Sequence, residues 1–179
     1  MKLKCPLFSL VALTVTLALL YGLSTAKPKG EKTSKVSLPE ELLNAAGKVV
    51  SAETLSGKYV GLYFSASWCP PCRTFTPKLV DFHKANKEKF EVLLVSGDNS
   101  EKAQANYMKK YMMPWLAVKH QSIAANLLVK KMGVSGIPFL VILAPDGSVV
   151  TKDGRGDIDS MGNKALLKWS SAQAEKLGR

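Results

Sequence analysis

Two continuous apolar runs dominate the hydrophobic pattern in the middle of the chain. One is residues 59–64, within a segment at 58–65, and the other is residues 92–95, within a segment at 90–96; neither run alternates with polar positions. A strand that is apolar on both faces is usually covered on both faces, so each run predicts a buried strand, and the second favours a central parallel one. Shorter strands are predicted at 48–50, at 139–143 and, after an Asp146-Gly147 turn, at 148–151.

Apolar residues at three- and four-residue spacing predict the helices between these strands. The spacing is clearest in 70–86, where Phe75, Leu79 and Phe82 form one stripe and Pro77 predicts a kink. Further helices are predicted at 39–46 before Gly47, after a cap at Asn99 or Ser100, at 122–131 and at 160–177.

Two of these helices have predicted inward faces of their own. In the helix at 122–131 that face carries Ile123, Leu127 and Leu128, and Gly133 follows its end. The inward residues of the last helix are Leu166, Trp169 and Ala172. Strands and helices alternate, and a strand hairpin and a helix close the chain. This order predicts an α/β fold with a central mixed β-sheet and helices on both faces.

The first part of the chain differs from the rest. Two lysines precede a nearly unbroken apolar run at 7–23, and residues 24–26 then provide small side chains where a signal peptidase cuts. This order predicts a signal peptide at 1–26 that is cleaved between Ala26 and Lys27. An uncleaved membrane anchor is the alternative, although a spanning helix needs about 20 apolar residues.

Cleavage would leave a lysine-rich segment at 27–37, which we interpret as a flexible linker, and a folded domain at 38–179. The formal net charge of the chain is +11, but its lysines are spread out and are not interleaved with aromatic residues. We therefore expect no nucleic-acid partner, and a membrane partner only if the first segment is retained. We expect a monomer.

Cleavage would also remove Cys5, and the remaining cysteines would be Cys69 and Cys72 in a compartment where disulfides persist. Two prolines separate them at the start of the helix predicted at 70–86. The helix N-terminus favours a thiolate on the first sulfur, and the second sulfur lies one turn inside the helix. We therefore predict a redox disulfide in which Cys69 attacks and Cys72 resolves.

Two other uses of the cysteine pair fit poorly. A structural disulfide across one helical turn closes too short a loop to stabilise much. A zinc site needs about four ligands, and His83 follows Cys72 by roughly 16 Å along the helix axis. We predict that His83 and His120 lie at the surface and that the site holds no metal.

The segment Tyr63–Pro77, with Trp-Cys-Pro-Pro-Cys at its centre, resembles the active-site segment of tryparedoxins and nucleoredoxins, a branch of the thioredoxin superfamily. Val95–Asp98 is similar to their strand-end segment, in which Trp is more frequent at the position of Gly97. Met113–Val118, Gly133–Pro138 and Pro145–Gly147 resemble further segments of these proteins. The resemblance covers roughly residues 47–160 and implies a thioredoxin-like fold.

The resemblance also implies roles for single residues. It places a cis peptide bond between Ile137 and Pro138, where the alternative is an ordinary trans turn. This bond and the Trp68 side chain would form the substrate-binding wall beside the first cysteine, and Trp115 would lie in the core. Typical thioredoxins carry a buried aspartate where this chain has Tyr63. This strand therefore offers no carboxylate base, and water or a Lys–Glu pair elsewhere in the protein would have to transfer the proton.

These observations favour an exported thiol–disulfide oxidoreductase that reduces protein or small-molecule disulfides. An external dithiol protein would supply the electrons, and no cofactor is expected because the chain lacks a glycine-rich phosphate loop. The bacterial periplasm is the expected compartment. Two alternatives stay open: a disulfide oxidase or isomerase of exported proteins, and a non-catalytic chaperone that holds a metal or an apo-cytochrome through its thiols.

Overall fold

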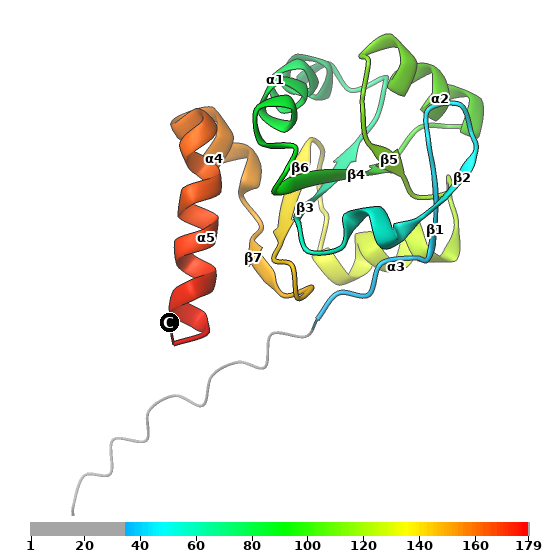
Figure 1. Cartoon of the computed structure of the whole chain (residues 1–179). Coiled ribbons are helices and arrows are strands. Elements are labelled where there is room, and N and C mark those ends of the chain that lie inside the picture. Colours follow the sequence, from blue (N-terminus) through cyan, green and yellow to red (C-terminus); the bar gives the residue numbers. More distant parts are fainter. Residues whose placement is uncertain (1–34, 179) are drawn as a thin grey trace, which may run out of the picture. The chain divides into compact units, whose positions relative to one another are not determined.

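A seven-stranded mixed sheet runs through the domain in the computed structural model, which describes residues 35–178 (Figure 1). Across the sheet the order is β2 (Val49–Ser51), β1 (Glu41–Leu43), β5 (Leu116–Ala117), β4 (Phe90–Ser96), β3 (Tyr59–Ser65), β6 (Phe139–Leu143) and β7 (Val149–Thr151). β3 pairs with β4 in parallel and with β6 antiparallel. The predicted α/β fold with a mixed sheet is confirmed, and β4 is central and parallel as expected.

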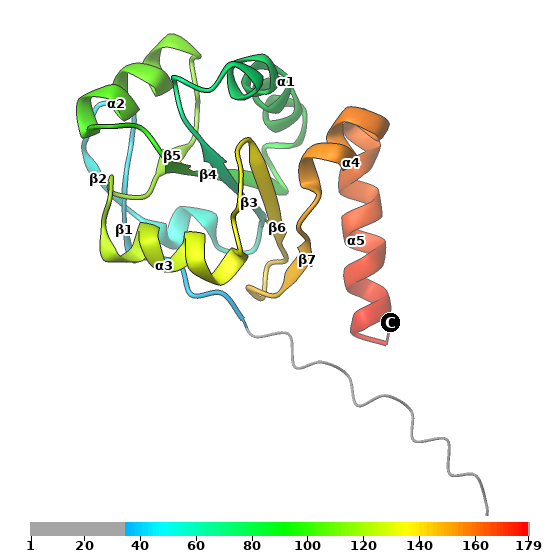
Figure 2. The ribbon, with the colours of Figure 1, turned by 180° about the vertical axis from the view of Figure 1, so that it is seen from behind.

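Helices cover both faces of this sheet. In Figure 1, α1 lies above the strands and α3 below them, and Figure 2 shows the same arrangement from behind. One core cluster contains residues of α1 (Pro70–Asn86), α2 (Glu101–Lys110), α4 (Gly154–Met161) and α5 (Ala165–Lys176). The other contains residues of α3 (Ile123–Met132) and of the short 3₁₀ helix η1 (Ala52–Leu55). The sheet therefore separates two apolar cores.

The helix starts follow the capping residues in the sequence. The Ser100 hydroxyl accepts the N–H of Ala103 at the start of α2, and the Ser122 hydroxyl accepts that of Ala125 at the start of α3, each at 3.1 Å. Both bonds satisfy N–H groups that have no partner within the helix. α1 has the predicted bounds.

The predicted signal peptide, its cleavage point and most of the predicted linker lie outside the described residues. At the end of the linker, Val36 is buried, and its N–H donates to the Gly147 carbonyl at 2.8 Å. Packing against the domain thus begins before Leu38. Within residues 35–178, no helix combines the length and the apolar character that crossing a bilayer requires.

The helix predicted at 39–46 is wrong, because this segment forms part of the β1–β2 hairpin. The Asn44 side-chain oxygen accepts the N–H groups of Ala46 at 2.9 Å and of Lys48 at 3.0 Å. Gly47 adopts a positive φ of 77°, which favours glycine. These local bonds close a tight turn and turn the chain back into the sheet.

The inward face predicted for α3 is wrong at two positions. Ile123 is 80% exposed and Leu127 is 60% exposed, whereas Leu128 is buried as expected. α3 packs through Ala125, Leu128 and Met132 instead. The small side chain of Ala125 lies on this packed stripe, whereas the larger side chains of Ile123 and Leu127 are exposed. The size of the apolar side chains therefore does not predict which face of α3 is buried.

The helix predicted at 160–177 is divided. Gly162, with a φ of 53°, ends α4, and α5 begins three residues later after the short 3₁₀ helix η2 (Gly162–Lys164). Leu166 and Trp169 are buried as predicted, but Ala172 is only half-buried. The positive φ at a glycine interrupts what a periodic pattern predicts as one helix.

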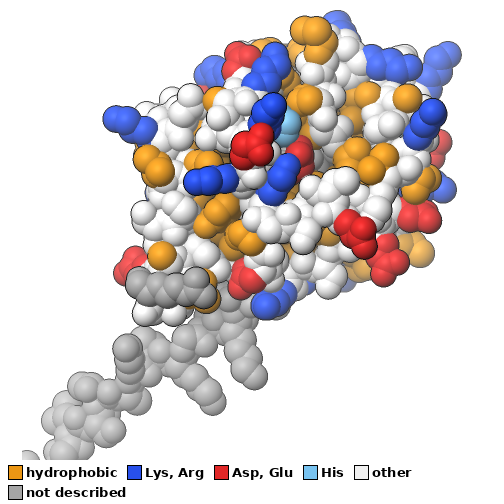
Figure 3. All heavy atoms as spheres, in the orientation of Figure 1, with side chains coloured by type: hydrophobic (Ala, Val, Ile, Leu, Met, Phe, Trp, Pro, Cys, Tyr) orange, Lys and Arg blue, Asp and Glu red, His pale blue; other side chains and the backbone are white. Residues whose placement is uncertain are grey.

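Basic side chains do not gather into one patch on the face that Figure 3 shows. Lysine and arginine there are scattered among acidic and hydrophobic side chains (Figure 3). Within the described residues, Asp159 pairs with Lys78 at 2.6 Å and with Arg155 at 3.7 Å. Exposed pairs of this kind contribute little to stability.

His83 is buried, so its predicted surface position is wrong. Its Nε2 lies 2.6 Å from a carboxylate oxygen of Glu91 on β4, and its ring packs edge-on against Trp115. Lys58 approaches the other carboxylate oxygen at 3.7 Å. Trp115 is itself buried, as the resemblance implied. A polar residue on the packed side of a helix is tolerated because a carboxylate on the neighbouring strand pairs with it.

We expect this pair to make stability depend on pH. Burial raises the pKa of Glu91, but the hydrogen bond and charge of His83, together with Lys58, outweigh burial and hold that pKa below its usual 4.5. A lowered pKa in the folded state stabilises the protein above pH 4.5, and this contribution is lost as pH falls through the folded-state pKa.

The test compares the free energy of unfolding of the wild type and Glu91→Gln between about pH 7 and about pH 3. The variant should be less stable at the higher pH, and the difference should shrink as pH falls. Glu88→Gln is the control, because Glu88 is exposed. A difference that stays constant with pH would contradict the assignment.

Candidate active site

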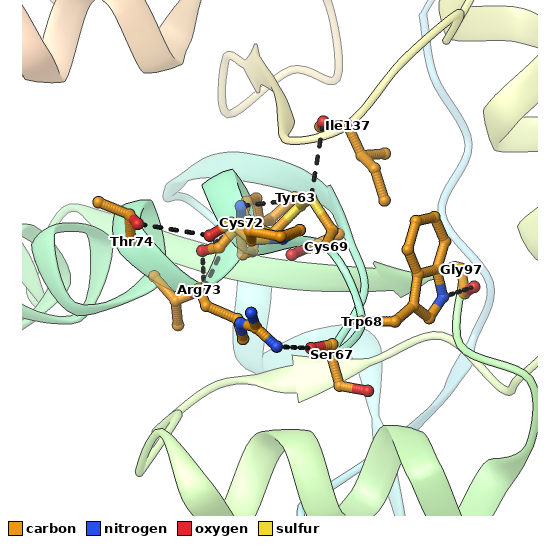
Figure 4. The surroundings of a disulfide bond; sticks show 12 residues. Tyr63, Ser67, Trp68, Cys69, Cys72, Arg73, Thr74, Gly97 and Ile137 are labelled. Carbon is orange, nitrogen blue, oxygen red and sulfur yellow. Dashed lines mark hydrogen bonds between the residues drawn. A yellow bond between two sulfur atoms is a disulfide. The ribbon is translucent and has the colours of Figure 1, made fainter.

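The cysteine pair lies where β3 ends and α1 begins (Figure 4). Cys69 caps α1 and Cys72 lies in its first turn; the two form a disulfide with their Cα atoms 5.3 Å apart. Because Pro70 and Pro71 have no N–H, the Cys72 N–H is the first free donor of the helix, and it donates to the Cys69 sulfur at 3.3 Å. In the reduced protein this donor and the helix N-terminus would stabilise a thiolate on Cys69.

The two sulfurs have different surroundings. Cys72 is completely buried, Cys69 is 4% exposed, and both pack against Ala66 and Ile137. The neighbouring Trp68 is 55% exposed, and its indole N–H donates to the Gly97 carbonyl at 3.0 Å. The outer position of Cys69 beside an exposed indole suits the attacking role that the sequence predicts.

The loop before β6 faces the pair from the other side. The Ile137 carbonyl oxygen lies 3.7 Å from the Cys69 sulfur, and the Ile137–Pro138 peptide bond is cis. In Figure 4, Ile137 lies above the disulfide and Trp68 lies to the right of it. The structure thus brings together the cysteines and the residues expected to bind substrate, although they come from separate segments.

A cluster of buried hydroxyl groups lies behind Cys72. The Thr76 hydroxyl donates to the Cys72 carbonyl at 2.8 Å and contacts the hydroxyls of Tyr63 at 2.9 Å and Tyr107 at 2.7 Å. Ser65 extends the cluster, with its hydroxyl 2.9 Å from that of Tyr107. Burial, and then the charge of Tyr107, raise the pKa of Tyr63 far above its usual value. The position that carries aspartate in typical thioredoxins therefore holds a protonated hydroxyl.

The sequence left open a Lys–Glu pair for proton transfer without identifying its residues. Among residues 35–178, the Lys–Glu ion pair is Lys58–Glu91, at 3.7 Å. Lys58 precedes β3 and Glu91 belongs to the start of β4, whereas the cysteines follow the opposite end of β3. Lys58 and Glu91 are therefore too far along the sheet to serve the cysteines.

Sequence reasoning missed two residues beside the site. Asp98 is buried and bonds to the loop that carries Trp68. His120 was expected at the surface, but it is half-buried, with Nε2 2.6 Å from the Asp98 carbonyl oxygen. Neither residue belongs to the Cys-Pro-Pro-Cys segment. The resemblance of Val95–Asp98 to the family was the only signal that pointed to either one.

A family model described as thioredoxin-like matches residues 57–149, more than half of the chain. The chain belongs to the thioredoxin-like family. Nucleoredoxin of Bos taurus is 39% identical over 162 residues, which are 84% of this chain but only 37% of that protein. Tryparedoxin of Trypanosoma brucei brucei is 40% identical over 132 residues, which are 72% of this chain and 90% of that protein.

The solved structures agree with these relatives. The structure of tryparedoxin II complexed with glutathionylspermidine is 38% identical and superposes with a TM-score of 0.64, covering 70% of this chain and 89% of that one. This thioredoxin-like protein is therefore related to nucleoredoxin and tryparedoxin. The chain spans about a third of the length of nucleoredoxin.

Proposed function

We propose that this chain is an exported thiol–disulfide oxidoreductase that reduces disulfides through Cys69 and Cys72. The observation that carries the proposal is the placement of the Cys69 sulfur at the N-terminus of α1. There it accepts the Cys72 N–H at 3.3 Å and lies 3.7 Å from the Ile137 carbonyl, beside an exposed Trp68. A thiolate in this position is stabilised, and the exposed Trp68 beside it offers a surface on which a substrate disulfide can dock.

The reaction follows from this geometry. The Cys69 thiolate attacks one sulfur of the substrate disulfide, which releases the other sulfur as a thiolate that takes up a proton. Cys72 then loses its proton and attacks the Cys69 sulfur of the mixed disulfide, which releases the second substrate thiol. Two electrons pass to the substrate, and the Cys69–Cys72 disulfide remains. An external dithiol protein restores the reduced pair.

Both protein and small-molecule disulfides belong to the proposed substrate class. The exposed Trp68 and the Ile137 backbone provide an apolar face and a hydrogen-bonding carbonyl, which suit an extended peptide around a disulfide. The complex of the related tryparedoxin II with glutathionylspermidine supports a small thiol compound as a further ligand type.

The direct test uses residues 27–179, the proposed exported form, whose two core clusters lie within the described part of the chain. The reduced protein should reduce insulin disulfides catalytically when a small dithiol such as dithiothreitol regenerates it. Glutathione disulfide should be reduced as well. A protein that releases no insulin thiols above the dithiol alone would contradict the proposal and favour a non-catalytic chaperone.

We also propose that residues 1–26 are removed during export, so that the exported protein begins at Lys27. The supporting feature is the order of a basic start, an apolar run and small residues in the sequence. N-terminal sequencing of the exported protein should yield Lys27 first, and cell fractionation should identify the compartment, with the periplasm as the expected one in a bacterium. An intact Met1 in a membrane fraction would contradict cleavage.

A further inference from the structure

The carboxylate of Asp98 is buried next to the active-site loop. Asp98 is only 2% exposed. Within residues 35–178, no lysine, arginine or histidine forms an ion pair with its carboxylate. One oxygen accepts the Ser67 N–H at 2.9 Å and the Ser67 hydroxyl at 2.6 Å. The other accepts the Ser96 hydroxyl at 2.7 Å. Neutral donors alone therefore satisfy a buried negative charge.

Further bonds join the same two loops. The Trp68 indole donates to the Gly97 carbonyl at 3.0 Å, and the Gly97 N–H donates to the Ser65 carbonyl at 2.8 Å. His120 supports Asp98 from the other side, with Nε2 2.6 Å from its carbonyl oxygen. Figure 4 shows Trp68 turned towards Gly97, with Ser67 on the same loop. The loop between β3 and Cys69 is thus bonded to the loop after β4.

We propose that Asp98 is a positioning residue for disulfide exchange. By holding Ser67 it fixes the backbone that leads into Trp68 and Cys69, and so keeps the Cys69 sulfur placed between the Cys72 N–H and the Ile137 carbonyl. The inference rests on the proposed function, because it assigns Asp98 a part in that reaction.

The chemistry of a carboxylate explains why this position carries one. A single carboxylate oxygen accepts two donors from Ser67 while the second accepts from Ser96, and charge-assisted bonds of this kind are stronger than neutral ones. Burying a charge without a counter-ion is nevertheless unfavourable. An arrangement of this type beside the reactive cysteine is expected where precise placement of a loop matters more than stability.

Asp157 in α4 provides a matched control. It is also buried, at 5% exposure, and its carboxylate also bonds to a tryptophan-bearing segment, accepting the indole N–H of Trp169 in α5 at 2.8 Å. Its ion pair is with Lys168 at 2.6 Å, and it has no bond to the loops at the cysteines. Asp157→Asn thus alters a buried carboxylate without altering the active-site loop.

The experiment compares Asp98→Asn and Asp157→Asn in the 27–179 protein, each measured under conditions in which it is folded. For Asp98→Asn we expect kcat/KM for insulin reduction to fall about 10- to 100-fold, the effect of a small misplacement of reacting groups. The rate at which reduced Cys69 is alkylated should differ from that of the wild type. Acrylamide should also quench the tryptophan fluorescence more strongly, and this change reports on Trp68 because the other two tryptophans are buried. Asp157→Asn should leave all three values near wild type.

Two results would overturn the inference: wild-type kcat/KM and quenching in folded Asp98→Asn, or an equal loss of activity in folded Asp157→Asn. If Asp98→Asn does not fold, Ser67→Ala removes the shortest bond and is judged by the same measurements. Inactive wild-type protein would instead contradict the proposed function. In that case alkylation and quenching still decide whether Asp98 positions the loop.

Discussion

Cys69→Ser is expected to abolish insulin reduction, and Cys72→Ser is expected to stop the reaction after the first attack. Serine at position 69 removes the thiolate that the helix N-terminus and the Cys72 N–H stabilise. Serine at position 72 leaves that thiolate in place but removes the group that resolves the mixed disulfide. The two variants should therefore fail at different steps.

Mass spectrometry after mixing with a disulfide substrate distinguishes these steps. Cys72→Ser should accumulate a covalent adduct on Cys69, whereas Cys69→Ser should accumulate none. Unfolding curves of both variants control for loss of structure, since both cysteines are buried. Adducts on Cys72 in Cys69→Ser, or faster alkylation of Cys72 than of Cys69 in the reduced wild type, would reverse the assigned roles.

Trp169→Ala is expected to have the largest effect on stability, a loss of about 3–5 kcal/mol. Trp169 is fully buried, and its ring packs against Phe82 at 5.5 Å and Phe90 at 5.6 Å between ring centres. Alanine would leave a cavity between α5 and the sheet. It would also remove the indole N–H that donates to the buried carboxylate of Asp157 at 2.8 Å.

Denaturant unfolding measures this loss. Leu167→Ala is the matched control on the same helix, because Leu167 is 67% exposed and its truncation should change stability by less than about 0.5 kcal/mol. Equal stability of Trp169→Ala and the wild type would show that α5 is not part of the cooperative core.

The parts of the fold that the sequence predicts well are those whose signals are local. β3, α1 and β4 each carry a complete apolar run or stripe, and the Cys-Pro-Pro-Cys spacing itself places the two sulfurs at the start of a helix. The hairpin at Asn44 and the break at Gly162 were missed because single residues there outweigh the periodic pattern. The buried face of α3 was missed because packing against the sheet, rather than side-chain size, selects it.

The rest of the site depends on contacts between residues that are far apart in the chain. Asp98 meets Ser67 across 31 positions, and Tyr107 meets Ser65 across 42. The Asp98–Ser67 contact exists because parallel pairing of β3 and β4 brings the ends of both strands to the same edge of the sheet, whereas the Tyr107–Ser65 contact depends on the packing of α2. The sequence predicts His83 at the surface for the same reason, since its partner Glu91 becomes a neighbour only in the folded sheet.

The reduction potential of the Cys69–Cys72 pair tests the central claim most directly. It is measured by equilibrating the 27–179 protein with glutathione buffers of defined ratio and quantifying the free cysteines. A protein that reduces disulfides should have a potential between about −200 and −270 mV, in the range of glutaredoxins and thioredoxin. A value near −120 mV, typical of a strong oxidant, would contradict the proposed direction and assign the protein to disulfide formation.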